Sequence, residues 1–184
     1  SQQTIPAGYK QTEIGVIPED WEVRFLSDLS FYINDGTHHT PKYVSDGVPF
    51  YSVENVSAND FENVKYISIE EHNNLIKRCR PEKGDLLMTR IGTLGKTRVI
   101  DWDVNASIYV SLALIKLKNN VDPNYVYVFS KSRAFRSEVE KRSLLNATPQ
   151  KINMSEIGEV LVPYPINNSS FGVQIGNYSP VNHR

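Results

Sequence analysis

The stretch GDLLMTRIGTLGKTR, residues 84–98, constrains the fold of this chain more than any other segment. Residues 85–89 form a largely apolar run with the length of a strand that is buried on both faces. Gly92 and Gly95 then bracket a tight turn, and residues 96–101 return to a strand-like pattern. The stretch therefore predicts a β-hairpin that contributes to the centre of a sheet.

The tip of the predicted hairpin gathers three cations and one hydroxyl, a combination that suits a polyanion. These residues are Arg90, Thr93, Lys96 and Arg98. An ordinary hairpin with solvated charges is the alternative interpretation. A phosphate loop of the form GxxxxGK[ST] is rejected, because its first glycine would fall on Arg90 and because a strand is predicted where that motif needs a helix.

Composition is that of an ordinary globular protein of one domain, with 184 residues, 40% hydrophobic and 22% charged. The single cysteine, Cys79, excludes a disulfide framework and a zinc site built from several thiolates. The first thirty residues have no apolar segment of the signal-peptide type, and no run approaches the length needed to span a bilayer. We therefore expect a cytoplasmic protein that contacts no membrane.

Charge is distributed unevenly along the chain, although the net charge is only −1. Residues 1–63 hold 3 Lys and Arg against 10 Asp and Glu, whereas residues 64–184 hold 17 against 11. A near-neutral total argues against general binding to nucleic acid. The asymmetry is compatible with one basic face on a nearly neutral protein.

Patterns along the chain predict an α+β domain, with a twisted, mainly antiparallel mixed sheet and a few helices packed on it. Helices are predicted near residues 69–79 and 123–142, the first from the capping box of Ser68 and Glu71 and the second from the cap of Asp122 and Pro123. Further strands are predicted at residues 21–25, 29–33, 48–53, 64–67, 107–117 and 158–162. The expected core of the sheet contains Leu86, Met88, Val110, Leu112 and Leu114.

Three segments follow from these patterns. Residues 1–20 are expected to form an irregular lead-in, residues 21–165 the folded domain, and residues 166–184 an irregular tail. Pro163 and Pro165 are expected to end the last strand.

No catalytic or metal-binding constellation is found in the sequence. His38 and His39 are adjacent, so that in extended backbone their side chains point to opposite sides and do not easily share one metal. No glycine-rich cofactor turn of the methyltransferase type is present, and DPNY at residues 122–125 is better explained as a helix cap. We therefore predict no catalytic residue and no metal site.

Four stretches in a fixed order resemble the target-recognition domain of a type I restriction-modification specificity (S) subunit. They are YKQTEIGVIPEDWEVRFLSDL (residues 9–29), DGTHHTPKYVSDGVPFYSVENV (35–56), GDLLMTRIGTLGK (84–96) and ATPQKINMSEIGEVLVPYP (147–165). The resemblance covers about residues 9–165. It implies the fold of these domains and identifies residues 21–165 as a DNA target-recognition domain.

The resemblance also implies a function. Such a domain is not itself an enzyme, and it reads one half of a split site in double-stranded DNA. It gives specificity to a complex with modification (M) methyltransferase subunits and, through them, restriction (R) subunits, which defends the cell against foreign DNA. No cofactor is expected in this chain, while S-adenosylmethionine, ATP and Mg are expected on the partner subunits.

The chain departs from the plan of a complete S subunit in two respects. It has one recognition domain where a complete subunit has two, and NNSSFGVQIGNYSPVNHR (residues 167–184) stands where a long docking helix is expected. These departures indicate a single-domain or truncated form.

Site residues are predicted from the need for cations on phosphates and polar side chains on base edges. The phosphate contacts are predicted to be Arg90, Lys96, Arg98 and Lys151. The base or groove contacts are predicted to be His38, His39, Lys42, Tyr43, Thr93 and Gln150. Two other functions stay open, namely a protein-interaction adaptor that docks a partner enzyme without touching DNA, and an uncharacterised hydrolase or nuclease.

Overall fold

Two apolar strands with side chains buried on both faces lie at the centre of the protein, whose residues 4–166 are described by a computed structural model. β8 (Leu86–Thr89) sends Leu86 and Met88 into one core cluster and Leu87 into another. β11 (Leu112–Leu117) alternates in the same way, because successive side chains of a strand point to opposite faces. The strand that the sequence predicts to be buried on both faces is confirmed.

The central sheet has the order β4-β11-β8-β9, and all its pairings are antiparallel. A second sheet has the order β10-β6-β7-β5, and two further pairs, β1-β2 and β12-β3, complete the strands. The remaining strands are β1 (Tyr9–Thr12), β2 (Gly15–Pro18), β3 (Trp21–Phe25), β4 (Ser30–Asp35), β5 (Tyr43–Val44), β6 (Val48–Tyr51), β7 (Lys65–Ile67), β9 (Thr97–Val99), β10 (Ser107–Ile108) and β12 (Leu161–Pro165).

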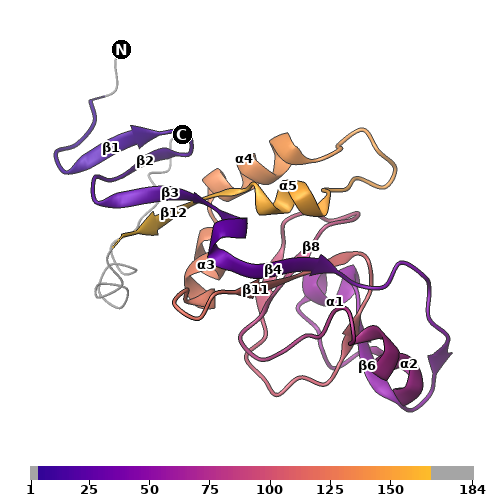
Figure 1. The fold of residues 1–184 in the computed structure, drawn as a ribbon. Helices are drawn as coiled ribbons and strands as arrows, with labels where there is room; N and C mark the ends of the chain where they lie inside the picture. The colour runs from indigo at the N-terminus through magenta and orange to yellow at the C-terminus, as the bar shows by residue number, and fades with distance from the viewer. Residues whose placement is uncertain (1–3, 167–184) are drawn as a thin grey trace.

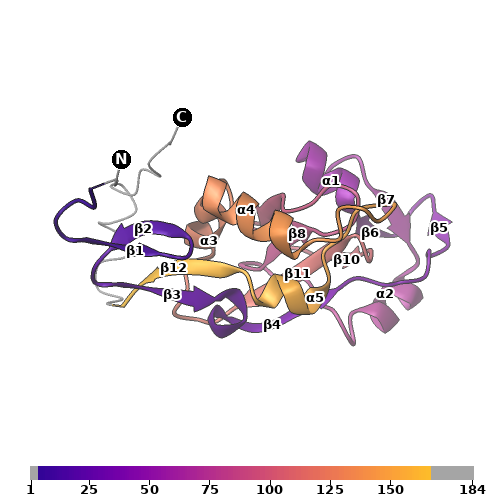
Figure 2. The same cartoon turned by 90° about the horizontal axis from the view of Figure 1, so that it is seen from above.

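The helices are short and cover the sheets from different sides (Figures 1 and 2). They are α1 (Val53–Ala58), α2 (Ile69–Leu75), α3 (Pro123–Phe129), α4 (Arg133–Arg142) and α5 (Met154–Gly158), with a 3-10 turn at Leu26–Leu29. One core cluster joins α3, α4, α5 and the β3-β12 pair to the central sheet, and the other joins α1, β6 and β10 to its opposite face. No helix between residues 4 and 166 combines the length and apolar character that crossing a bilayer requires.

The predicted fold class is confirmed, since helices pack on sheets in which, among the named strands of residues 4–166, only the β10-β6 pairing is parallel. The helices near 69–79 and 123–142 are present as α2, α3 and α4. Four of the five predicted core residues are buried, and Val110 is half-buried.

The predicted single strand at residues 107–117 is wrong. The backbone N–H of Leu112 donates to the carbonyl of Tyr109, which closes a turn between β10 and β11. The two strands then join different sheets, and Val110 lies in the turn. A continuous apolar run therefore conceals a change of sheet.

Two predicted boundaries are also wrong, both at the ends of the domain. The lead-in is the β1-β2 hairpin, and Ile17 of β2 is 1% exposed within the main core cluster. The last strand runs from Leu161 to Pro165 and includes both prolines, which are tolerated because, among the strands of residues 4–166, β12 pairs only with β3. The predicted tail, apart from Ile166, lies outside the described residues.

The strand predicted at residues 48–53 is shorter than expected. β6 ends at Tyr51, and Ser52 begins α1 through a capping box with Asn55. The sequence does not signal this box, because Asn55 occupies the position where Glu or Gln is usual.

Gly36 fixes the course of the chain where β4 leaves the central sheet. Its N–H donates to the carbonyl of Leu112 at 3.2 Å. A Cβ atom at this position would overlap the backbone carbonyl oxygens of Ile108 and Tyr109, which no side-chain rotation relieves. The close approach of two backbones explains glycine here.

Gly36→Ala is expected to lower the free energy of unfolding by about 1–3 kcal/mol, because the backbone must separate from residues 108–109. Urea denaturation followed by circular dichroism measures the change. Ser45→Ala, at an exposed position, is the control and is expected to stay within about 0.5 kcal/mol of the parent. Equal midpoints for the two variants would contradict the close approach.

Candidate nucleic-acid interface

Arg90 is buried beneath the loops that the sequence predicts to contact DNA. Its Nε donates to the carbonyl of Ile152 at 3.2 Å, and its Nη1 donates to the carbonyl of Val110 at 2.8 Å. The residue is only 6% exposed. The expectation that the hairpin tip presents Arg90 to a polyanion is therefore wrong, because the guanidinium is buried and its Nε and Nη1 donate to carbonyls within the protein.

Asp35, at the end of β4, is the acidic partner of this guanidinium. Its Oδ2 lies 3.5 Å from Nη1 of Arg90 and 2.7 Å from Nε2 of His38, and its Oδ1 lies 3.2 Å from Nη1 of Arg78. Burial lowers the pKa of Arg90, and the charge of Asp35 opposes that shift. Arginine stays protonated in spite of such burial, so Arg90 and Asp35 form a buried ion pair.

Arg78 holds the same loop from the other side. Its Nη2 donates to the carbonyls of Asp35 and Gly36 at 2.6 and 2.8 Å. Arg78 and Arg90, both more than forty positions after Asp35 in the sequence, meet at its carboxylate. The first residues of the loop after β4 are thus fixed by side chains and by backbone.

Four backbone segments are joined into one surface above Arg90, which we call the loop platform and define as residues 35–40, 90–93, 109–111 and 144–152. Isolated β-bridges pair Thr37 with Tyr109, Ile91 with Lys151, and Leu144 with Lys151. The N–H of Gly92 also donates to the carbonyl of Gln150 at 2.8 Å. The platform thus consists of loops whose positions relative to one another are set by hydrogen bonds.

Thr93, Gln150 and Lys151 are exposed and adjacent on this platform. The pairing of residues 91–92 with residues 150–151 brings them together from segments about sixty positions apart in the sequence. A hydroxyl, an amide and an ammonium group therefore occupy one patch. Such a set can donate to phosphates and exchange hydrogen bonds with base edges.

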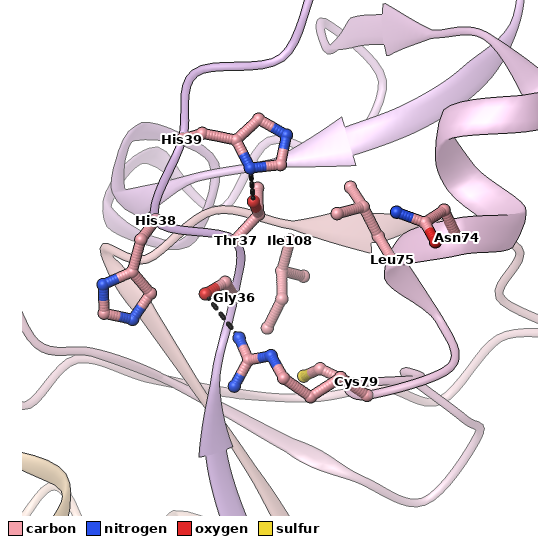
Figure 3. Close-up of a pocket in the computed structure, with 9 residues that line it drawn as sticks. Gly36, Thr37, His38, His39, Asn74, Leu75, Cys79 and Ile108 are labelled. Carbon is pink, nitrogen blue, oxygen red and sulfur yellow. Dashed lines mark hydrogen bonds between the residues drawn. The ribbon is translucent and has the colours of Figure 1, made fainter.

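His38 and His39 lie on the first segment of the platform. Their side chains are 71% and 62% exposed. Nδ1 of His39 lies 2.8 Å from Oγ1 of Thr37, and Nε2 lies 3.2 Å from Oε1 of Glu71. Figure 3 shows the two imidazole rings directed away from each other. Residues 4–166 contain no group of three His, Cys, Asp or Glu that could hold a metal ion.

A pocket of about 330 Å³ lies beside these histidines, between the loop after β4 and α2 (Figure 3). Gly36, Thr37, Asn74, Leu75 and Cys79 are among the residues that line it. Burial raises the pKa of the Cys79 thiol to about 11, so the thiol is protonated at neutral pH. The pocket therefore presents no activated nucleophile at its cysteine.

Lys96 and Arg98 are directed away from the loop platform, toward the end of α1. Nζ of Lys96 lies 3.5 Å from the carbonyl of Ser57, and the side chain is otherwise exposed. Arg98 donates to the side chain of Asn59 and lies over the rings of Phe61 and Trp102, at 5.5 and 5.3 Å from their centroids. The structure thus separates the three cations that the sequence placed at one tip.

Lys42 and Tyr43 lie at β5, on the edge of the second sheet. Tyr43 is 38% exposed and has Nζ of Lys65 4.6 Å above its ring. Both residues are accessible, but β5 pairs with β7 and does not belong to the platform.

Asp35, Arg78 and Tyr109 were not predicted as site residues. Tyr109 contributes its hydroxyl, 2.9 Å from Oγ1 of Thr40. No local pattern identifies these residues, because each acts through a partner distant in sequence.

Replacing Arg90 is expected to loosen the platform. Arg90→Ala leaves Asp35 without its buried partner and is expected to cost about 3–5 kcal/mol of unfolding free energy. Arg90→Lys keeps the positive charge but lacks the planar set of guanidinium donors, so a smaller loss of unfolding free energy than for Arg90→Ala is expected. Urea denaturation compares both with Lys151→Ala, an exposed control expected to change stability by less than about 0.5 kcal/mol. An Arg90→Ala protein as stable as this control would contradict the assigned role.

Known proteins provide an independent comparison. Residues 18–175 match the family model described as the type I restriction modification DNA specificity domain. The type I restriction enzyme MjaIX specificity subunit of Methanocaldococcus jannaschii is 26% identical over 167 residues, which are 85% of this chain and 37% of that protein.

Two solved structures have a similar fold. The S subunit of a type I restriction-modification system from M. genitalium superposes with a TM-score of 0.56 at 17% identity, over 82% of this chain and 36% of that one. A structure described as showing complex assembly and conformational transition of the type I R-M system gives a TM-score of 0.56 at 19% identity, over 81% of this chain and 35% of that one. This chain thus spans little more than a third of each of these proteins, and the match of the family model across most of its length shows that it belongs to the type I restriction modification DNA specificity domain family.

Proposed function

We propose that this chain reads one half of a split site in double-stranded DNA and gives sequence specificity to a type I restriction-modification complex, without catalysis of its own. The family match over residues 18–175 carries this proposal. The loop platform supports it, because sequence-specific reading needs polar side chains held in fixed positions on a scaffold. A platform of joined loops meets that requirement.

The predicted contact residues that stay exposed, on the platform and beside it, divide into two chemical roles. Lys151 is proposed to contact phosphate, and Lys96 is proposed to extend that contact along the side of α1. Thr93, Gln150, His38 and His39 are proposed to meet base edges, with Lys42 and Tyr43 contacting the flanking groove. Arg90 and Arg98 are assigned to the scaffold, because their donors are occupied within the protein.

The proposed partner subunits are those of a type I restriction-modification complex. The proposed complex contains modification (M) methyltransferase subunits, which would carry S-adenosylmethionine, and restriction (R) subunits, which would use ATP and Mg. A second recognition domain is proposed to read the other half of the site. The proposed setting is the cytoplasm, and the proposed role is defence against foreign DNA.

Binding to duplex DNA is expected to weaken steeply with salt, because each phosphate contact releases counterions. With the two proposed phosphate contacts, affinity is expected to fall about 12-fold between about 50 and 200 mM salt. Fluorescence anisotropy with a labelled duplex measures this dependence. A chain that acted as a protein-interaction adaptor would bind duplex DNA without this dependence or would not bind it.

Lys151→Ala and Gln150→Ala are expected to change DNA binding in two different ways. The first should weaken binding to all sequences alike and reduce the salt slope by about 1, whereas the second should change which half-site is preferred. Anisotropy titrations at several salt concentrations measure the first effect, and selection from a randomised half-site library measures the second. Lys118→Ala, an exposed lysine beyond the end of β11 that is distant from the platform, is the matched control. A changed preference with Lys151→Ala and an unchanged one with Gln150→Ala would reverse the assignment.

A further inference from the structure

Two consecutive leucines, Leu144 and Leu145, are exposed on the loop platform beside the proposed reading residues. They are 48% and 44% exposed. Single exposed apolar residues are common on protein surfaces, but these two stand together at the edge of a patch of polar groups. Figure 1 shows the chain between α4 and α5 extending beyond the ends of both helices.

The leucines are held in position by the same network that fixes Lys151. The N–H of Leu144 donates to the carbonyl of Lys151 at 2.7 Å, and the N–H of Ala147 donates to the carbonyl of Leu144 at 3.3 Å. Lys151 in turn pairs with Ile91, and the next residue, Ile152, accepts from the buried Arg90. Leu145 thus lies in a turn that is connected to the scaffold through two successive backbone pairings.

The chemistry of DNA offers one apolar group at a base edge of the major groove, the 5-methyl group of thymine. Gln150, whose carbonyl joins the same network, carries the side chain that pairs with both N6 and N7 of adenine. An amide suited to adenine and an apolar pair suited to thymine methyl groups therefore lie on neighbouring segments. Together they are complementary to a half-site that contains A·T pairs.

We propose that Leu144 and Leu145 contact thymine 5-methyl groups and so favour A·T pairs at the positions of the half-site that they contact. This inference rests on the proposed DNA-reading function. Lys151 would hold the adjacent phosphate and set the depth at which the leucines enter the groove. The leucines are then specificity-determining residues, and they add to the polar contacts predicted from the sequence.

Replacement of thymine by uracil tests this inference, because uracil lacks only the methyl group and keeps the base pair. The half-site preferred by the 184-residue chain is first selected from a randomised duplex library, and each thymine is then replaced in turn. Binding by the parent is expected to weaken about fourfold at one or more positions, the effect of burying one methyl group. The Leu144→Ala/Leu145→Ala variant is expected to bind thymine and uracil duplexes equally.

Matched variants separate this result from a general loss of structure. Leu144→Met/Leu145→Met keeps apolar contact and is expected to retain discrimination against uracil. Val128→Ala removes an apolar side chain of equal exposure, 48%, from α3 and is expected to bind as the parent does. Thermal melting of all variants checks that each is folded.

The outcomes distinguish this inference from the function on which it rests. Salt-dependent, sequence-selective binding that ignores uracil at every position would overturn the leucine contact alone, as would a selected half-site without thymine. An alanine variant that lost affinity equally for both duplexes would also overturn it, in favour of a wedge between base steps. Absence of duplex binding by the parent would overturn both proposals.

Discussion

The buried pair of Arg90 and Asp35 is the interaction on which the rest of the candidate site depends. It connects the loop after β4 to the turn between β10 and β11, and to the loop before α5, through one guanidinium and two carbonyls. A buried charge is costly unless it is paired and hydrogen-bonded. Here the guanidinium is paired with Asp35, and its Nε and Nη1 donate to carbonyls. The pair therefore favours a single arrangement of loops that come from distant parts of the chain.

The central sheet makes this arrangement possible by placing Arg90 directly after a strand that is buried on both faces. β8 and β11 are anchored by two core clusters, so the residues at their ends have little freedom. Thr89 is fully buried, and its backbone pairs with Lys96 across the hairpin. Rigid strands thus position loops whose exposed side chains are available to contact DNA. Binding residues on loops held by a rigid scaffold are typical of binding sites.

The sequence predicted the fold class, the central strands and most helices, because those features depend on local periodicity and capping. It did not predict that Arg90 is buried, since only the partners at Asp35, Val110 and Ile152 determine the direction of its side chain. It also merged β10 and β11, because an apolar run carries no signal for a change of sheet. Of the site residues, Thr93, Gln150 and Lys151 are brought together by pairing between residues about sixty positions apart, which no local pattern encodes.

Hydrogen–deuterium exchange of the 184-residue chain, with and without its selected duplex, tests the central claim most directly. If the loop platform is the reading surface, residues 36–40, 91–93 and 144–152 should gain protection together on binding, while the β1-β2 hairpin and α3 should be unchanged. Protection confined to one of those loops, or located on the hairpin or α3, would contradict the account.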